Sequence, residues 1–141
     1  MADVKIIDHS DEVLKALSEA EEAALEAMGQ QGVSYAKTNI TEAGRVDTGA
    51  LRNSISHLVV EKETAVYIGT NMEYAIYNEL GTGIYAEGGR GRKSPWAYQD
   101  AKGNWHRTNG MRPIHFLKRA ASEHGKEYQA IAGNELAKRM K

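Results

Sequence analysis

Residues 10–43, SDEVLKALSEAEEAALEAMGQQGVSYAKTNITEA, carry the pattern that decides the fold. Ser10 precedes Asp11 and Glu12, a typical helix start, because a serine hydroxyl accepts a free backbone N–H and acidic groups suit the positive end of the helix dipole. Apolar residues then recur every three or four positions, at Val13, Leu17, Ala20, Ala24 and Met28. This spacing predicts a helix with one apolar face.

Gly29 and Gly32 interrupt this helical pattern before it resumes towards Ala43. Each glycine weakens a helix by about 1 kcal/mol relative to alanine, so we predict a kink or a break there. An unbroken helix from Ser10 to Ala43 would be ~50 Å long. A compact chain of this size has a radius of gyration of roughly 14 Å. An unbroken helix would therefore overhang its own domain and require a partner.

Two segments of the chain predict β-hairpins. Residues 55–61 and 64–69 are rich in Val, Ile and Tyr and are separated by two polar residues, as expected for strands joined by a tight turn. Residues 96–98 and 104–106 predict a second, smaller hairpin, in which Gly103 supplies the positive φ that a bulged turn requires.

Two further helices are predicted. Asn71 is placed to cap a short helix over 72–80, with Met72, Ile76 and Leu80 on one face and Gly81 ending it in the left-handed conformation. Pro113 is placed to open a long last helix. Its helical spacing runs through Leu117, Ala120, Ala121, His124, Tyr128 and Ile131.

The remaining segments complete the predicted architecture. Residues 81–95 contain five glycines, which leaves few side chains to pack and predicts a mobile loop. Residues 1–9 would add an edge strand. We therefore predict one α+β domain over 1–141: a small antiparallel sheet packed against long N- and C-terminal helices, with an extra hairpin and a Gly-rich loop.

Composition excludes several classes of protein. The chain has 141 residues, of which 41% are hydrophobic and 26% are charged, as is ordinary for a globular domain. It contains 0 cysteines, which excludes disulfides and thiolate chemistry. We expect no signal peptide, because residues 1–15 lack a basic end followed by an apolar run, and no membrane span, because no apolar run is long enough. With 18 Lys and Arg against 19 Asp and Glu, the formal charge is −1, and no global field attracts nucleic acid.

The run Asp47-Thr48-Gly49-Ala50 resembles the active-site loop of retroviral-type aspartic proteases, in which two subunits each contribute one carboxylate. In those enzymes an apolar strand precedes the aspartate, whereas residues 41–45 here are polar or small. The alternative is structural, with Asp47 or Thr48 capping a short helical turn. We favour the cap and keep the homodimeric protease as an alternative.

Two other kinds of site receive little support. A phosphate-binding glycine loop needs a strand before it and a helix directly after it, and the loop over 81–95 has neither. The five histidines form no i, i+4 pair that would bind a metal. We therefore predict no cofactor and no metal site.

Basic and aromatic residues gather in and after the Gly-rich loop. Such residues would stack bases and neutralise phosphates in a small nucleic-acid-binding module, but Trp and Arg are also favoured anchors in protein interfaces. Because the chain as a whole is not basic, we favour an assembly contact with another protein subunit. The residues concerned are Arg90, Arg92, Lys93, Trp96 and Trp105.

Four motifs in order resemble the phage tail-component family typified by gene product ten of phage Hong Kong ninety-seven. They are an acid-Thr-Gly-x-Leu-Arg-x-Ser-Ile segment, a Gly-Thr turn, a Tyr-Ala helix and a Glu-x-Gly-Thr-Gly ending. The matching residues are Asp47, Thr48, Gly49, Leu51, Arg52, Ser54, Ile55, Gly69, Tyr74, Ala75, Glu79, Gly81, Thr82 and Gly83. Later residues also resemble the longer members, so the likeness spans roughly 47–120, whereas the N-terminal helix matches only in being a helix.

The resemblance implies a non-enzymatic structural protein of a tailed phage or prophage, acting in head-tail joining or tail completion. It implies a homo-oligomeric ring in the virion and contacts with neck or tail proteins, with no membrane and no specific nucleic acid as partner. It further implies assembly in the bacterial cytoplasm and a final place in the neck or tail of the particle.

Overall fold

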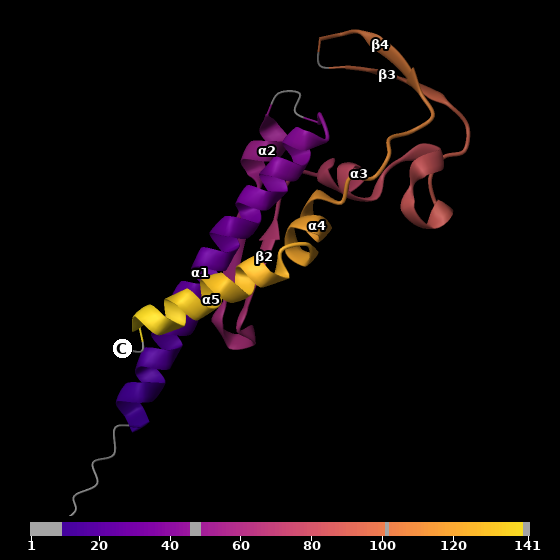
Figure 1. Cartoon of the computed structure of the whole chain (residues 1–141). Helices are drawn as coiled ribbons and strands as arrows, with labels where there is room; N and C mark the ends of the chain where they lie inside the picture. Colours follow the sequence, from indigo (N-terminus) through magenta and orange to yellow (C-terminus); the bar gives the residue numbers. More distant parts are fainter. Residues whose placement is uncertain (1–9, 46–48, 101, 140–141) are drawn as a thin grey trace, which may run out of the picture.

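The computed structural model describes residues 10–45, 49–100 and 102–139 and has the predicted α+β architecture (Figure 1). Three short 3-10 turns lie at Glu61–Glu63, Gly83–Tyr85 and Glu87–Gly89. The helices and strands, in chain order, are α1 (Ser10–Glu42), α2 (Ala50–Ser54), β1 (Ser56–Val60), β2 (Ala65–Gly69), α3 (Ala75–Leu80), β3 (Trp96–Gln99), β4 (Trp105–Thr108), α4 (Phe116–Ser122) and α5 (Gly125–Arg139).

Helix α1 runs unbroken through both glycines, so the predicted break is wrong. The glycines are buried because other elements approach the helix there. A Cβ on Gly29 would lie 2.6 Å from the ring of His57 and 2.8 Å from Val66, in the first hairpin. A Cβ on Gly32 would lie 3.2 Å from both Ile68 of β2 and the hydroxyl of Tyr128 in α5. Close packing therefore outweighs the helix propensity of glycine at these positions.

Gly29→Ala is expected to destabilise the protein, although alanine is the better helix former. The added methyl group would overlap His57 and Val66, and overpacking of this kind costs about 1–3 kcal/mol. Gly133→Ala in α5 is the matched control, because a Cβ there meets nothing within 4 Å. The control should gain up to about 1 kcal/mol. Urea unfolding of both variants measures the difference, and a stabilised Gly29→Ala would contradict the packing described here.

Both predicted hairpins are present and form two separate two-stranded sheets. In the first, β1 and β2 pair antiparallel with Leu58 opposite Tyr67, and this hairpin packs against α1. In the second, β3 and β4 pair antiparallel with Trp96 opposite Thr108, and Gly103 has the expected positive φ of 87°.

The boundaries of the later helices differ from the prediction. Helix α3 begins at Ala75 rather than at 72, with Tyr74 and not Asn71 at its N-cap, so the predicted cap is wrong. Gly81 ends the helix with a positive φ of 81°, but its ψ of 172° is not that of the predicted left-handed conformation. The last helix begins three residues after Pro113 and is divided into α4 and α5. At the junction the hydroxyl of Tyr128 donates a hydrogen bond to the carbonyl of Ala120, so a side chain satisfies a carbonyl near the end of α4. Helix α5 then lies along α1 (Figure 1).

The main hydrophobic core lies where α1, α2, α3 and α4 meet. Phe116 and Ile40 are its largest fully buried side chains, and the aromatic ring of Tyr35 stacks on His124 with a centroid distance of 3.5 Å. Partly buried residues of β2 and of the segment before α4 pack around it. The buried residues are Ala36, Ile40, Leu51, Ile55, Ala75, Phe116 and Ala120.

The N-terminal end of α1 overhangs the rest of the molecule, as the length of an unbroken helix predicts (Figure 1). Ala20 is the first buried residue of the helix, and nine of the ten residues before it are exposed, Ala16 being half-buried. At about 1.5 Å per residue, roughly 15 Å of helix extends beyond the core.

Two predictions fall on residues outside the described ranges: the edge strand over 1–9, and the helix cap by Asp47 or Thr48. The short helix that this cap would serve is present as α2, with Gly49 at a φ of 83° before it. Within the described ranges, no helix combines the length and apolarity needed to cross a bilayer.

Candidate assembly surface

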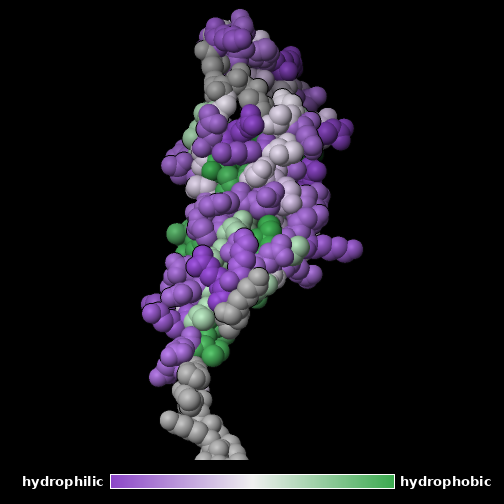
Figure 2. Space-filling view, turned by 60° about the vertical axis from the view of Figure 1, so that its left-hand side comes forward, coloured by the Kyte–Doolittle hydropathy of each residue, from purple (hydrophilic) through white to green (hydrophobic). Residues whose placement is uncertain are grey.

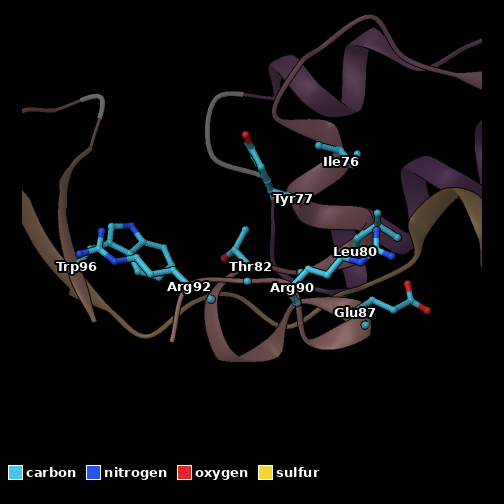
Figure 3. Close-up of a pocket in the computed structure, with 13 residues that line it drawn as sticks. Ile76, Tyr77, Leu80, Thr82, Glu87, Arg90, Arg92 and Trp96 are labelled. Atoms are coloured by element: carbon cyan, nitrogen blue, oxygen red, sulfur yellow. The ribbon is translucent and has the colours of Figure 1, made fainter. Parts of the chain in front are cut away.

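A groove of about 830 Å³ lies between α3 and the Gly-rich loop (Figure 3). One wall consists of apolar side chains of α3, and the other is formed by the loop with its two arginines. The lining residues are Ile76, Tyr77, Leu80, Gly81, Thr82, Gly83, Ala86, Glu87, Gly88, Arg90, Gly91, Arg92 and Trp96.

The floor of the groove is built by backbone pairing between residues 81–84 and 109–111. The N–H of Thr82 donates to the carbonyl of Met111 at 2.8 Å, and the N–H of Ile84 donates to the carbonyl of Asn109 at 3.0 Å. The hydroxyl of Thr82 accepts the N–H of Met111 at 2.9 Å. Thr82 therefore joins the loop to the segment before α4 through both its backbone and its side chain.

Glycine is required where these two segments touch. Gly83 has a φ of 63°, and a Cβ there would lie 1.9 Å from the carbonyl oxygen of Asn109. A Cβ on Gly110 would lie 2.1 Å from the carbonyl oxygen of Thr82, and one on Gly91 would lie 2.1 Å from that of Gly83. The loop is thus folded back on itself with two 3-10 turns, and its glycines permit backbone contact.

Glu79 fixes α4 against α3. Its carboxylate accepts the backbone N–H groups of Leu117 and Lys118, both at 2.9 Å, which lie in the first turn of α4. The preceding N–H of Ile114 donates to the carbonyl of Asn78 at 2.9 Å. A carboxylate at a helix N-terminus satisfies free donors and interacts favourably with the helix dipole. Glu79 is therefore a positioning residue for the wall of the groove.

Glu79→Ala is expected to cost about 1–2 kcal/mol, since it removes two hydrogen bonds at a helix N-terminus. Glu123→Ala is the matched control: this carboxylate pairs with Arg119 on the helix surface at 2.9 Å, and exposed pairs contribute up to about 0.5 kcal/mol. Urea unfolding compares the two. Equal stability of the two variants would show that the contact of Glu79 with α4 contributes little to the free energy of unfolding.

Three of the five predicted contact residues lie on the groove. Arg90, Arg92 and Trp96 line it, and the guanidinium of Arg92 lies 5.6 Å from the ring centroid of Trp96 (Figure 3). Lys93 is exposed in the same loop but is not part of the lining. Trp105 lies on β4, away from the groove, and is 70% exposed.

The other family-motif residues mostly hold the core together. Leu51, Ile55 and Ala75 are buried in it. The hydroxyl of Ser54 donates to the carbonyl of Leu51. Arg52 and Tyr74 are exposed, and a Cβ on Gly69 would meet open space, so nothing in the structure explains this glycine.

Sequence reasoning missed the polar groups that join α1 and the segment directly after it to later parts of the chain. The amide of Asn39 donates to the carbonyl of Phe116 at 3.1 Å. The guanidinium of Arg45 donates to the side-chain oxygen of Asn78 at 3.1 Å and to the carbonyl of Arg112. Burial lowers the pKa of Arg45. Because these partners are 33 to 77 residues apart in sequence, no local pattern indicates them.

Two of the described histidines, His57 and His106, each pair with one carboxylate, and the histidines do not gather at one place. Nε2 of His57 lies 2.7 Å from Glu26, and Nε2 of His106 lies 2.7 Å from Asp100. The hydrogen bond with His106 is the largest cause that lowers the pKa of Asp100, and backbone N–H groups add to it. Over the described ranges, no group of three or more His, Asp or Glu side chains would hold a metal ion.

The surroundings of the Asp47 motif are helical on both sides, with α1 ending at Glu42 and α2 beginning at Ala50. An aspartic-protease loop would instead follow an apolar strand. The aspartate itself lies outside the described residues.

Comparison with known families identifies the chain. Residues 5–87 match the model of the family described as "Bacteriophage HK97-gp10, putative tail-component". The match includes α1, which sequence reasoning took to be similar only in being a helix, and it ends at Glu87, before the later residues thought to resemble longer members. Neither the comparison with curated proteins nor that with solved structures gave a match. Since the match covers more than half of its length, the chain belongs to this family of phage tail components.

Proposed function

We propose that the protein is a non-enzymatic structural subunit that acts in head-tail joining or tail completion by docking to other subunits. The observation that carries this proposal is the groove between α3 and the Gly-rich loop, whose floor is made by Gly81, Thr82 and Gly83, the segment that resembles the Gly-Thr-Gly ending of the family. The role of these three residues is therefore to shape the docking surface.

The groove has the chemistry of a protein interface. Ile76 and Tyr77 are each 54% exposed and Leu80 is 38% exposed, so apolar area lies open on one wall. Contiguous exposed apolar surface with a polar rim marks interaction sites, and Trp and Arg are enriched among the residues that anchor them. With a formal charge of −1, the chain has no broad positive field of the kind that draws proteins to nucleic acid. A protein partner in the neck or tail fits these properties.

The proposal places the protein in the virion at the neck or upper tail, after assembly in the host cytoplasm. Deleting the gene from the phage or prophage tests this. We expect DNA-filled heads and tails that fail to join, or unfinished tails, together with loss of plaques, and rescue by the gene supplied in trans. Electron microscopy of the lysates distinguishes these defects. Normal joined and infectious particles after deletion would contradict the proposal.

Shortening the loop at 87–94 to a few Gly and Ser residues should spare folding and abolish complementation. No residue of this segment is buried, and changing the length of a surface loop alters closure entropy only slightly, by roughly 0.6 kcal/mol per twofold change. The shortened protein should therefore unfold cooperatively with a nearly unchanged Tm while failing to rescue a deleted phage. Loss of the cooperative transition would show that the loop belongs to the core, and full rescue would show that it makes no assembly contact.

A further inference from the structure

The exposed end of α1 carries an apolar face surrounded by acidic residues. Leu14 is 63% exposed, Val13 51% and Leu17 36%. Leu17 follows Leu14 by three positions and Val13 by four, so the three side chains lie on one face of the helix. Between Ser10 and Glu22 the helix has five acidic side chains and one lysine. Figure 2 shows hydrophobic surface at this end of the molecule.

The groove has the complementary properties. Ile76, Tyr77 and Leu80 offer apolar contact area. Between Ile84 and Trp96 the chain has three basic side chains and one acidic one, Glu87. Helix-in-groove recognition uses anchors three and four residues apart on an amphipathic helix, which is the spacing of the apolar residues at the start of α1. The two surfaces therefore match in apolar pattern and in charge.

The two surfaces cannot meet within one molecule, because they lie at opposite ends of it (Figure 1). We propose that the N-terminal end of α1 of one copy docks into the groove of the next copy. This inference rests on the proposed function and names its first partner, a second copy of this chain. A contact between two different surfaces is heterologous, and repeated with a closing rotation it generates a ring.

Charge favours this contact over pairing of like surfaces. Two acidic α1 ends would repel each other, as would two basic loops, whereas an α1 end and a groove attract. The apolar residues then provide the contact area that exposed charges alone do not supply.

Two variants break opposite halves of the contact. Leu14→Asp places a charge in the apolar face of α1, and Ile76→Asp does so in the groove wall. Both residues are exposed, and Ile76 also lies in the first turn of its helix, where an aspartate suits the helix dipole, so both variants should fold. Leu58→Asp is the matched control: Leu58 is 64% exposed, like Leu14, but lies on the first hairpin.

Light scattering after size exclusion measures the result. The wild type and Leu58→Asp should form closed oligomers, and each of the other variants alone should associate about tenfold or more weakly. An equal mixture of Leu14→Asp and Ile76→Asp should give 1:1 dimers that do not grow, because one intact α1 end meets one intact groove. Unchanged association of either variant, or a mixture that behaves as the sum of its parts, would overturn the proposal.

Disulfide trapping tests the same contact when association is weak. The sequence has 0 cysteines, so Leu14→Cys with Ile76→Cys in one chain introduces the only thiols. Oxidation should give a ladder of covalent oligomers that ends at a closed ring. Leu58→Cys with Ile76→Cys should give no such ladder, and an equal ladder from this control would overturn the proposal.

Complementation separates this inference from the proposed function. If the inference fails and the function holds, Leu14→Asp rescues a deleted phage and enters its particles, whereas Ile76→Asp, which changes the groove itself, does not. If the function fails, the chain self-associates in the predicted way and yet deletion of its gene leaves the particles normal.

Discussion

Gly83→Ala is expected to open the floor of the groove while leaving the core folded. Alanine at a φ of 63° costs about 1–2 kcal/mol by itself. Its Cβ would also overlap the backbone of Asn109 and Gly110, at 1.9 to 2.7 Å, and backbone atoms cannot turn aside as a side chain can. The two effects together cost about 3 kcal/mol or more, which exceeds the cost of breaking the few backbone hydrogen bonds of this pairing. Residues 81–84 and 109–111 should therefore separate.

Hydrogen exchange detects this opening. The amides of Thr82, Ile84 and Met111 should lose their protection, whereas amides of α1 in the core should keep most of theirs. Gly44→Ala is the control, because Gly44 also has a positive φ, of 69°, but a Cβ there meets nothing within 4 Å. The control should lose only about 1 kcal/mol of stability and keep the groove. Retained protection in Gly83→Ala would contradict the backbone contact.

Phe116→Ala should cause the largest loss of global stability. Phe116 is the single phenylalanine of the sequence, is fully buried, and its carbonyl accepts the amide of Asn39 from α1. Truncating a buried phenylalanine costs about 3–5 kcal/mol, a large part of the roughly 5–15 kcal/mol that holds a domain folded.

Thermal and urea unfolding test this prediction against Leu58→Ala. Leu58 is 64% exposed and should lose less than about 1 kcal/mol. A Phe116→Ala variant as stable as this control would show that the core does not lie between α1 and α4.

The sequence predicted the elements better than their boundaries. The apolar stripe from Val13 to Met28 and the two β-rich segments give periodic signals, and both are confirmed. The break at Gly29 was wrong because burial against His57 and Val66 decides the conformation there, and such contacts join distant parts of the chain. The start of α4 was misplaced because it is set by Glu79 of α3, not by the nearby Pro113.

The candidate surface was predicted in part. Arg90, Arg92 and Trp96 stood out by residue type and lie on the groove, whereas Trp105 also stood out and does not. The sequence did indicate the wall formed by Ile76 and Leu80. These apolar residues are four positions apart on one face of a helix, and the loop that follows has too many glycines to cover them. Whether this face would be covered depends on the folded path of the loop, which local patterns do not determine.

The position of the protein in purified particles decides whether it is a subunit of the neck or tail. Particles purified on a density gradient would be analysed by mass spectrometry and labelled with gold-conjugated antibodies against this chain. We expect the protein in every infectious particle in a fixed small number of copies, with the label at the neck or upper tail. Infectious particles that lack the protein would contradict it.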